Sequence, residues 1–389
     1  MMKYDFDKII SRRGTGSSKW DQRSEDILPM WVADMDFQSP PAVIEALKKR
    51  AEHGIYGYPL PMDSYYDAII HWVGRRHGWK IERDWIMFSP GVVPGISAII
   101  RSITKPGDKV ILQRPVYYPF FADIEHNGRH ILNNPLKYVN GHYEMDFPDL
   151  EQKAKDPRAK ALILCSPHNP VGRVWSKEEL TRLGEICVNN NIIIISDEIH
   201  CDLIYKGYTH TCFASINETF LQNSITCFAP SKTFNLAGLQ TSAIIIPNPK
   251  MRQEYDNMIV KARVIPSAPN IFGAIALEAA YNHGDDWLEQ LMDYVAGNLA
   301  FLKKWVETRI PRIKVVEPEG TYLVWLDCRD LGMDANSLER FMLEKAKVWF
   351  DEGYIFGPEG EGFERINIAC PRAILEEGLK RLENAINRL

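Results

Sequence analysis

The sequence predicts an α/β protein with a large domain, built on an open and mostly parallel sheet, and a smaller α+β domain. In the middle of the chain, short β-branched runs alternate with helical patterns, which is typical of a sheet covered by helices. From about residue 285, a long amphipathic helix precedes further short strands, which indicates a second body. The length of 389 residues fits two domains.

Six runs are predicted to form strands of the large sheet, because they are apolar at successive positions, as strands covered on both faces must be. In chain order they are Ile86–Phe88, Val110–Gln113, Ala161–Cys165, Ile192–Ser196, Ile225–Phe228 and Ala243–Ile246. Ligands bind beyond the carboxyl ends of strands in such sheets. The residues that follow these runs are therefore the first candidates for a functional site.

The helices between these strands carry their own boundary signals. A helix is expected over 41–53, and the basic run 48–50 in its last turn complements the helix dipole better than it suggests nucleic acid. An apolar helix is expected around Ile96–Ile103. Ser176 and Glu179 have the spacing of a capping box and predict the start of another helix.

The C-terminal part is expected to mix helices with strands. One face of a long helix is marked by Leu288, Leu291, Val295, Leu299, Leu302 and Val306. It is followed by strand-like Ile313–Val316 and Tyr322–Leu326, a helix near Ser337–Lys347, strand-like Arg365–Ile368 and a C-terminal helix. The N-terminal segment is too short to fold alone, so we expect a large domain of 45–284 and a small domain of 1–44 with 285–389.

Composition excludes several classes of protein. With 46 Lys and Arg, 51 Asp and Glu and 45% hydrophobic residues, the chain is neither disordered nor strongly basic, so no nucleic-acid partner is expected. The seven cysteines form no CxxC pair, which favours reduced thiols over disulfides or structural zinc. The N-terminus does not resemble a signal peptide, and no apolar run reaches the ~20 residues that span a bilayer. We expect a cytoplasmic protein without a membrane contact.

Three polar stretches follow predicted strands and place Asn169, Asp197 and Lys232 at strand ends. A lysine just past a buried strand can form a Schiff base once desolvation lowers its pKa. An aspartate can hold a protonated pyridine nitrogen, and an asparagine can bond a phenolic oxygen. Alone, Lys232 could be a surface lysine and Asp197 a helix cap, but together the three match the needs of pyridoxal 5'-phosphate (PLP).

Two other motifs are rejected. Gly14–Lys19 looks like a phosphate loop, but it lacks the GxxxxGK[ST] order and no strand precedes it. Asp197, His200, Cys201 and Asp202 include metal-ligand types, but a local helix would point them in different directions. We expect no metal site.

The motifs also resemble those of a known family. The stretches that carry the closer resemblance are Leu28–Phe37 (LPMWVADMDF), Ser196–His200 (SDEIH) and Pro230–Asn235 (PSKTFN). From about residue 4 to its C-terminus, the chain resembles fold-type I PLP enzymes of the aminotransferase class I/II superfamily, and more closely the MalY/PatB branch of cystathionine β-lyase-like C–S lyases. This resemblance implies PLP as cofactor and a mostly parallel seven-stranded sheet sandwiched by helices in the large domain.

The resemblance implies a role for each candidate residue. Lys232 would form the Schiff base and move the Cα proton, Asp197 would pair with the ring nitrogen, and Asn169 would bond the ring hydroxyl oxygen. Tyr117 would stack on the ring, although it could also be a core aromatic. The other cofactor contacts would come from Ser231, from His200 and from backbone N–H groups of Gly91, Val92 and Val93 at a helix N-terminus.

Substrate and partner contacts are implied in the same way. Arg365 would clamp the substrate α-carboxylate as a bidentate fork, with Val32 and Asn169 beside it, although an arginine of this kind could be a surface ion-pair residue. Tyr58 would reach the phosphate from a second subunit, which makes a homodimer with a shared active site obligatory. A tyrosine between Gly57 and Pro59 could equally be loop packing.

Three positions depart from the wider superfamily. Ala229 stands where many aminotransferases have a phosphate-binding serine, Gln240 where many have an arginine, and His200 where they often have a tyrosine. The phosphate would therefore depend more on backbone groups and on Tyr58. These departures weaken an assignment as a plain aminotransferase.

The preferred hypothesis is a PLP-dependent β-elimination from L-cystathionine or a related cysteine S-conjugate, which yields a thiol, pyruvate and ammonia. An aminotransferase shares the early steps, so it stays the first alternative. A PLP-binding regulatory protein with incidental turnover is the second. The set of Lys232, Asp197 and Arg365 argues against the second, because binding alone needs no proton-transfer lysine.

Overall fold

The computed structural model describes residues 3–261, 264–266 and 268–389. At its centre is a seven-stranded sheet with the order β2-β10-β9-β8-β7-β3-β4. The strands are β2 (Ile86–Ser89), β3 (Lys109–Leu112), β4 (His130–Asn133), β7 (Ala159–Cys165), β8 (Ile193–Asp197), β9 (Ser224–Phe228) and β10 (Ser242–Ile245). The pairs from β4 to β9 are parallel, and β10 is antiparallel to both of its neighbours. The predicted mostly parallel, seven-stranded sheet is confirmed.

Two strands differ from the expectations drawn from single runs of residues. β4 carries no clear signal, because His130–Asn133 mixes polar and apolar residues at the edge of the sheet. β10 has the same apolar composition as the parallel strands, but it is antiparallel to both of its neighbours. Its link to β9 contains only the short α8 (Pro230–Thr233) and η3 (Ala237–Leu239), so no helix carries the chain back along the sheet.

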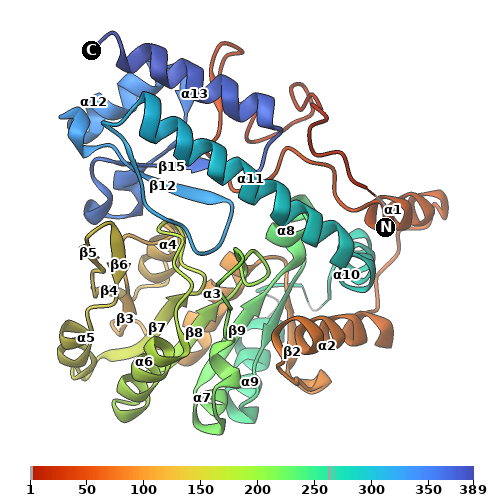
Figure 1. The fold of residues 1–389 in the computed structure, drawn as a ribbon. Helices are drawn as coiled ribbons and strands as arrows, with labels where there is room; N and C mark the ends of the chain where they lie inside the picture. Colours follow the sequence, from red (N-terminus) through yellow and green to blue (C-terminus); the bar gives the residue numbers. More distant parts are fainter. Residues whose placement is uncertain (1–2, 262–263, 267) are drawn as a thin grey trace.

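Helices cover both faces of the sheet (Figure 1). One apolar layer holds α3 (Val92–Ile103), α4 (Pro119–Glu125) and α9 (Pro249–Tyr255), and the other holds α5 (Phe147–Ala154), α6 (Lys177–Asn189) and α7 (Glu218–Gln222). Along β7, Ile163 packs in the first layer and Leu162 and Leu164 in the second, as the two-residue period of a strand requires. At α6, the predicted capping box is present, with Ser176 Oγ accepting from the Glu179 amide at 3.1 Å.

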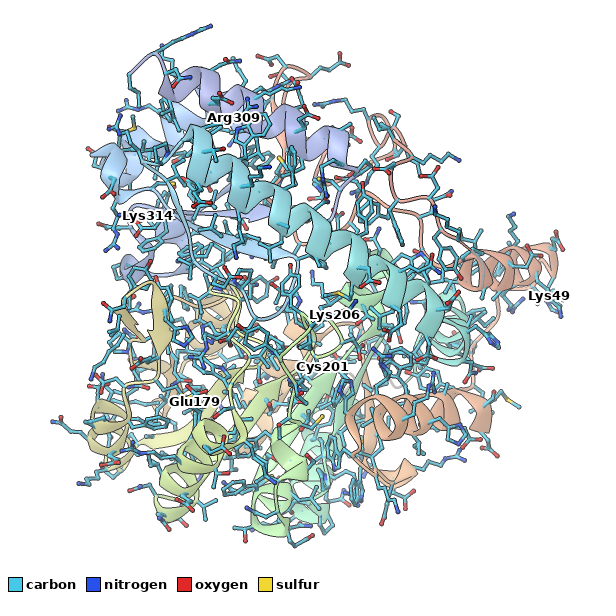
Figure 2. The ribbon with its side chains drawn as sticks, in the orientation of Figure 1. Lys49, Glu179, Cys201, Lys206, Arg309 and Lys314 are labelled. Carbon is cyan, nitrogen blue, oxygen red and sulfur yellow. The ribbon has the colours of Figure 1, made fainter. Side chains whose placement is uncertain are left out.

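A third apolar cluster joins the remaining helices of the large body to the C-terminal part. It includes α1 (Pro41–Glu52), α2 (Asp63–His77), α10 (Ile271–His283), the long α11 (Asp285–Arg309) and α13 (Arg372–Ile386). The basic run of α1 does lie in its last turn, and Lys49 sits at the periphery of the molecule (Figure 2). None of the helices in the described ranges combines the length and apolar character that a bilayer crossing requires.

The C-terminal part is built on a four-stranded antiparallel sheet of order β11-β12-β15-β14. Its strands are β11 (Lys314–Val315), β12 (Leu323–Asp327), β14 (Asp351–Glu352) and β15 (Phe363–Asn367), and α12 (Ala335–Arg340) continues into the π-helical η6 (Phe341–Lys345). The N-terminal segment joins this body, because β1 (Leu28–Pro29) pairs in parallel with β13 (Val348–Trp349). In Figure 1, part of the red N-terminal segment runs beside the blue helix α13. The domain limits of 45–284, and 1–44 with 285–389, stay a prediction.

The other elements are short. They are the hairpin β5 (Lys137–Val139) and β6 (His142–Glu144), the 3-10 helices η1 (Arg83–Trp85), η2 (Phe213–Ser215), η5 (Arg329–Leu331), η7 (Gly353–Phe356) and η8 (Pro358–Gly360), and the π-helical η4 (Asp256–Val260). All seven cysteines are buried and free of disulfides.

Candidate active site

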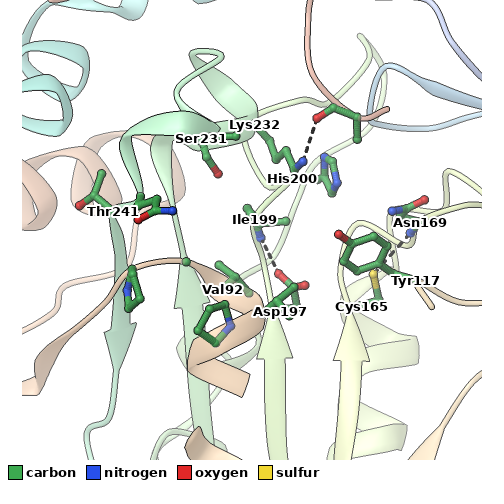
Figure 3. A pocket seen from close by; sticks show the side chains of 17 residues that line it. Val92, Tyr117, Cys165, Asn169, Asp197, Ile199, His200, Ser231, Lys232 and Thr241 are labelled. Atoms are coloured by element: carbon green, nitrogen blue, oxygen red, sulfur yellow. Dashed lines mark hydrogen bonds between the residues drawn. The ribbon is translucent and has the colours of Figure 1, made fainter. Parts of the chain in front are cut away.

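A cavity of about 200 Å³ lies beyond the carboxyl ends of β7, β8 and β9. Figure 3 shows its side chains gathered above the tips of the strands. The chain turns to opposite sides of β3 at this edge, first to β4 and then to β7, and such a reversal is where open α/β sheets bind ligands. The predicted residues that line the cavity are Gly91, Val92, Val93, Tyr117, Asn169, Asp197, His200, Ser231 and Lys232.

Lys232 is held at the cavity by the short helix α8. Its Nζ donates to the Ala33 carbonyl at 2.8 Å, a bond drawn in Figure 3. Next to it, Thr233 Oγ1 donates to Asp202 Oδ2 at 2.8 Å, which anchors α8 to the segment after β8. Burial and the positive charge of Arg365 lower the pKa of Lys232 to about 8. A substantial fraction of unprotonated amine is therefore available near neutral pH, as nucleophilic attack requires.

Asp197 ends β8 and is buried below Lys232. Oδ1 accepts from the Ile199 amide at 3.1 Å. Burial raises the pKa of Asp197 to about 7, although this amide and the charge of Lys232 act in the opposite direction. A buried carboxylate with so few donors gains most from a cationic hydrogen-bond donor, which the protonated nitrogen of a pyridine ring supplies.

The first turn of α3 closes one end of the cavity. Gly91 is its N-cap and provides no side-chain cap, so the amides of Val92 and Val93 keep their bonding capacity. The N-terminus of a helix attracts an anionic group such as a phosphate. Gln240, which also lines the cavity, takes a left-handed backbone conformation with φ of 51°.

His200 and Tyr117 face the cavity from beyond the ends of β8 and β3, which lie on either side of β7 (Figure 3). Burial, with the nearby charges of Lys232 and Arg365, lowers the pKa of His200 well below its usual value, so its imidazole is neutral. Its Nδ1 is buried without a hydrogen-bond partner. Burial likewise raises the pKa of Tyr117, which keeps the phenol protonated.

Arg365 is buried beside the cavity but does not line it. Its Nη1 donates to Asn169 Oδ1 at 2.9 Å, and its Nη2 donates to the Trp31 carbonyl at 2.9 Å. Nη2 also forms an ion pair with Asp351, which faces Arg365 across the strand pair β14–β15. The alternative of a surface ion pair is wrong, because both side chains are 2% exposed.

The stretch 31–35 of the N-terminal motif contacts the rest of the protein through its backbone. Its backbone carbonyls point into the protein and accept from side chains of distant elements. Ala33 accepts from Lys232 and from Tyr322 Oη, which donates at 3.0 Å. Asn367 Nδ2 donates to the carbonyl of Val32 at 2.6 Å, and also to that of Asp34. Val32 therefore contributes a backbone contact near the site and does not line the cavity.

Tyr58 lies outside this cavity. It belongs to the coil between α1 and α2, its side chain is fully exposed, and it borders a separate cavity formed with α10. Within one chain, the structure therefore does not bring Tyr58 to Lys232.

Of the four possible metal ligands, Asp197 ends β8 and the other three lie on the turn that follows, and the four separate into two pairs. Asp197 and His200 line the cavity, whereas Cys201 and Asp202 contact His77 in the interior. The four residues therefore do not point to one place, but Cys201 and Asp202 share a direction, and their donor atoms and that of His77 lie within 4.8 Å of one another. His77 Nε2 is 2.8 Å from Asp202 Oδ1 and 3.4 Å from Cys201 Sγ, distances of hydrogen bonds. A second group of this kind consists of Glu198, His210 and Cys212.

Two functional contacts had no signal in the sequence. The Ala33 carbonyl meets Lys232 across 199 positions, and a backbone acceptor has no residue-type signature. Asp351 meets Arg365 through the pairing of β14 with β15, and β14 has only two residues. A strand this short shows no recognisable period.

Comparisons with known proteins agree with this geometry. The sequence profile of the family described as Aminotransferase class I and II matches residues 25–382. The chain is 46% identical over 388 residues to cystathionine beta-lyase PatB of Bacillus subtilis, covering 98% of this chain and 100% of the relative.

Two solved structures are also similar to this chain. Cystalysin from Treponema denticola, which contains a PLP cofactor, superposes with a TM-score of 0.96 at 43% identity and full coverage of both chains. A PLP-bound C–S lyase from Staphylococcus hominis superposes with a TM-score of 0.93 at 34% identity, covering 99% of this chain and 98% of that one. The resemblance predicted from the sequence is confirmed: the chain belongs to the aminotransferase class I and II family.

Proposed function

We propose that this protein is a PLP-dependent C–S β-lyase that cleaves L-cystathionine or a related cysteine S-conjugate into a thiol, pyruvate and ammonia. The observation that carries the proposal is the convergence of Lys232, Asp197 and Asn169 on one buried cavity, in a chain 46% identical to a cystathionine beta-lyase. A small amino acid is the substrate, and PLP is the cofactor.

The residues that line the cavity match the ring nitrogen, the ring hydroxyl and the phosphate of PLP. Asp197 would accept from the protonated ring nitrogen, Asn169 would bond the ring hydroxyl oxygen, and the Val92 and Val93 amides would hold the phosphate. When bound, PLP supplies an electron-withdrawing ring that stabilises the negative charge left at Cα after a proton is removed. Ser231 and His200 complete the lining.

Lys232 performs the proton transfer at the substrate Cα. Its lowered pKa of about 8 places the amine near the working pH, which is where a general base is most effective. The Ala33 carbonyl fixes the side chain by accepting from Nζ. Loss of the proton at Cα is followed by cleavage of the Cβ–S bond, and the thiolate departs.

Arg365 and Asn169 orient the substrate. The guanidinium is buried and bonded to Asn169, so the contact to the substrate carboxylate and the contact to the cofactor hydroxyl lie side by side. This arrangement aligns the Cα–H bond with the base, and alignment of this kind contributes to rate by reducing the entropy lost in reaching the transition state. From the segment 31–35, Ala33 lines this side of the cavity.

Tyr58 supports an assembly of two copies. It stands in an exposed apolar stretch with Ile55, Tyr56, Leu60 and Met62. An exposed patch of this kind is typical of a protein interface. In a homodimer, Tyr58 of one protomer reaches the phosphate in its partner. The seven free, buried thiols support a cytoplasmic location.

The alternative activity is transfer of an amino group to a 2-oxo acid. The test incubates the holoenzyme with L-cystathionine and without any 2-oxo acid, and measures pyruvate with lactate dehydrogenase. The lyase releases pyruvate continuously. Absence of pyruvate, together with glutamate formation when 2-oxoglutarate is added, would contradict the lyase and establish the aminotransferase.

A further inference from the structure

The guanidinium of Arg365 already donates hydrogen bonds to protein groups at the positions that a substrate carboxylate would occupy. A guanidinium has one N–H on Nε and two on each Nη, and a carboxylate binds it as a fork through Nη2 together with either Nε or Nη1. Both Nη2 hydrogens are occupied, one by the Trp31 carbonyl and one by Asp351. Nε is buried without a partner. Both pairs of N–H groups include Nη2, whose hydrogens are already bonded. A carboxylate that binds Arg365 through two N–H groups must therefore displace one of the acceptors on Nη2.

Of the two acceptors on Nη2, the Trp31 carbonyl is the more firmly held. The neighbouring Met30 amide donates to the Trp349 carbonyl at 2.8 Å, and the Met30 carbonyl accepts from the Asn367 amide at 2.8 Å. The Trp31 ring stacks on Trp349 with centroids 4.3 Å apart. The carboxylate of Asp351, by contrast, turns about two side-chain bonds. The Asp351 carboxylate can therefore leave Nη2 more easily than the Trp31 carbonyl can.

The position of Asp351 follows from the fold. β14 and β15 are antiparallel, and Asp351 is directly opposite Arg365, so both side chains emerge on the same face of the sheet. The next pair, Glu352 and Glu364, lies on the other face. The strand register therefore places the carboxylate of Asp351, and not that of Glu352, beside Arg365.

We propose that Asp351 is an internal competitor of the substrate: it occupies Arg365 in the free enzyme, the substrate α-carboxylate displaces it, and this exchange sets the affinity for the substrate. The inference rests on the proposed function in using Arg365 as the carboxylate clamp. Burial raises the pKa of Asp351, which agrees with a carboxylate that is costly to keep charged once it leaves its partner.

The test measures binding to the holoenzyme by calorimetry. The probe is 3-(methylthio)propionate, which is S-methylcysteine without its amino group, and 3-(methylthio)propanamide is its neutral counterpart. In Asp351→Asn, we expect the propionate to bind about tenfold more tightly than in the wild type, the effect of about one charge-assisted hydrogen bond, with the amide unaffected. Glu352→Gln replaces the neighbouring acidic side chain on the opposite face and should leave both affinities as in the wild type.

Equal or weaker binding of the propionate to Asp351→Asn would overturn the proposal and make Asp351 a residue that merely positions Arg365. In turnover of L-cystathionine, the same distinction appears as a lowered KM for an internal competitor and a raised KM for a positioning residue. Calorimetry needs no turnover, so a failure of the lyase assignment, seen as no pyruvate from the wild type, stays separate from a failure of this inference.

A second measurement covers the case in which Asp351→Asn does not fold. A crystal structure of the wild-type holoenzyme with 3-(methylthio)propionate should show the ligand carboxylate on Nη2 of Arg365 and Asp351 turned away. A carboxylate bound to Arg365 with Asp351 still on Nη2 would overturn the proposal.

Discussion

Lys232 is the residue on which the chemistry depends most directly. Replacing Lys232 with Ala removes the amine that forms the imine with the cofactor and the base that takes the Cα proton. We expect the imine absorbance near the visible range to disappear and kcat for pyruvate release to fall by at least about 10³-fold. Lys250→Ala, at an exposed lysine, serves as the control and should keep both properties.

Activity of Lys232→Ala within tenfold of the wild type would exclude Lys232 as the base. If the protein were instead a PLP-binding regulatory protein, its biological effect would survive in Lys232→Ala although turnover is lost.

Asp197 connects catalysis to the stability of the protein without cofactor. Its pKa in the folded chain is raised to about 7 from the ordinary 3.8, mainly by burial, so the folded state binds this proton more tightly than the unfolded state. Between about pH 4 and 7, stability contributed by this group therefore falls as pH rises, and above pH 7 the full cost of a charged, buried carboxylate remains.

Removing this charge should stabilise the protein without cofactor while impairing the enzyme. At pH 8, we expect cofactor-free Asp197→Asn to be more stable than the wild type by about 4 kcal/mol in urea unfolding, with little difference at pH 4. The holoenzyme should lose most of its kcat. A variant that is less stable than the wild type at pH 8 would show that Asp197 has a cationic partner even without the cofactor.

Among the elements, the N-terminal segment depends on a buried ion network. Lys19 is 1% exposed, and its Nζ lies 2.7 Å from Asp36 Oδ2. Asp36 Oδ1 also accepts from Arg12 Nη1 and Trp20 Nε1, each at 2.8 Å. These bonds hold the loop that supplies the carbonyls of Trp31 and Ala33 to the active site. The rejected phosphate-loop motif thus contains a lysine with a structural role.

Breaking this network should cost far more than breaking a surface pair. Asp36→Ala removes the 2.7 Å partner of the buried Lys19 and leaves it only Asp34, whose Oδ1 lies 4.0 Å from Nζ, so we expect a loss of about 3–5 kcal/mol in the free energy of unfolding. Asp293→Ala breaks the exposed pair with Lys206, whose side chain is 90% exposed, and should cost less than about 1 kcal/mol. Comparable losses in the two variants by urea titration would contradict a structural role for the network.

The elements that the sequence predicts well are those with a local signal. The isoleucine strand β8, the capping box at Ser176 and the lysine after β9 are each recognisable within a few residues. Direction and pairing have no such signal: β10 has the composition of a parallel strand but runs antiparallel. The contact of Asp351 with Arg365 depends on strand register, which only the assembled sheet fixes.

At the scale of the whole molecule, the proposed function predicts that a second copy completes the site at the phosphate end. The superfamily's serine and arginine positions are occupied by Ala229 and Gln240, so within this chain the anion site depends on the backbone at α3. Tyr58 has a relative exposure of 107%, the most exposed large apolar side chain among the described residues. A residue this exposed gains a role when a second copy covers it.

A shared site makes a quantitative prediction for mixed dimers. Lys232→Ala and Tyr58→Ala should each lose most activity as homodimers at limiting PLP, because each lacks one part of every site. After unfolding and refolding at an equal ratio, half of the dimers contain one chain of each kind. In such a dimer, the Tyr58→Ala chain contributes an intact Lys232 and its partner contributes an intact Tyr58, so one of two sites is complete. We therefore expect about a quarter of wild-type pyruvate release. Activity no higher than the mean of the two variants would place Tyr58 outside the partner's site.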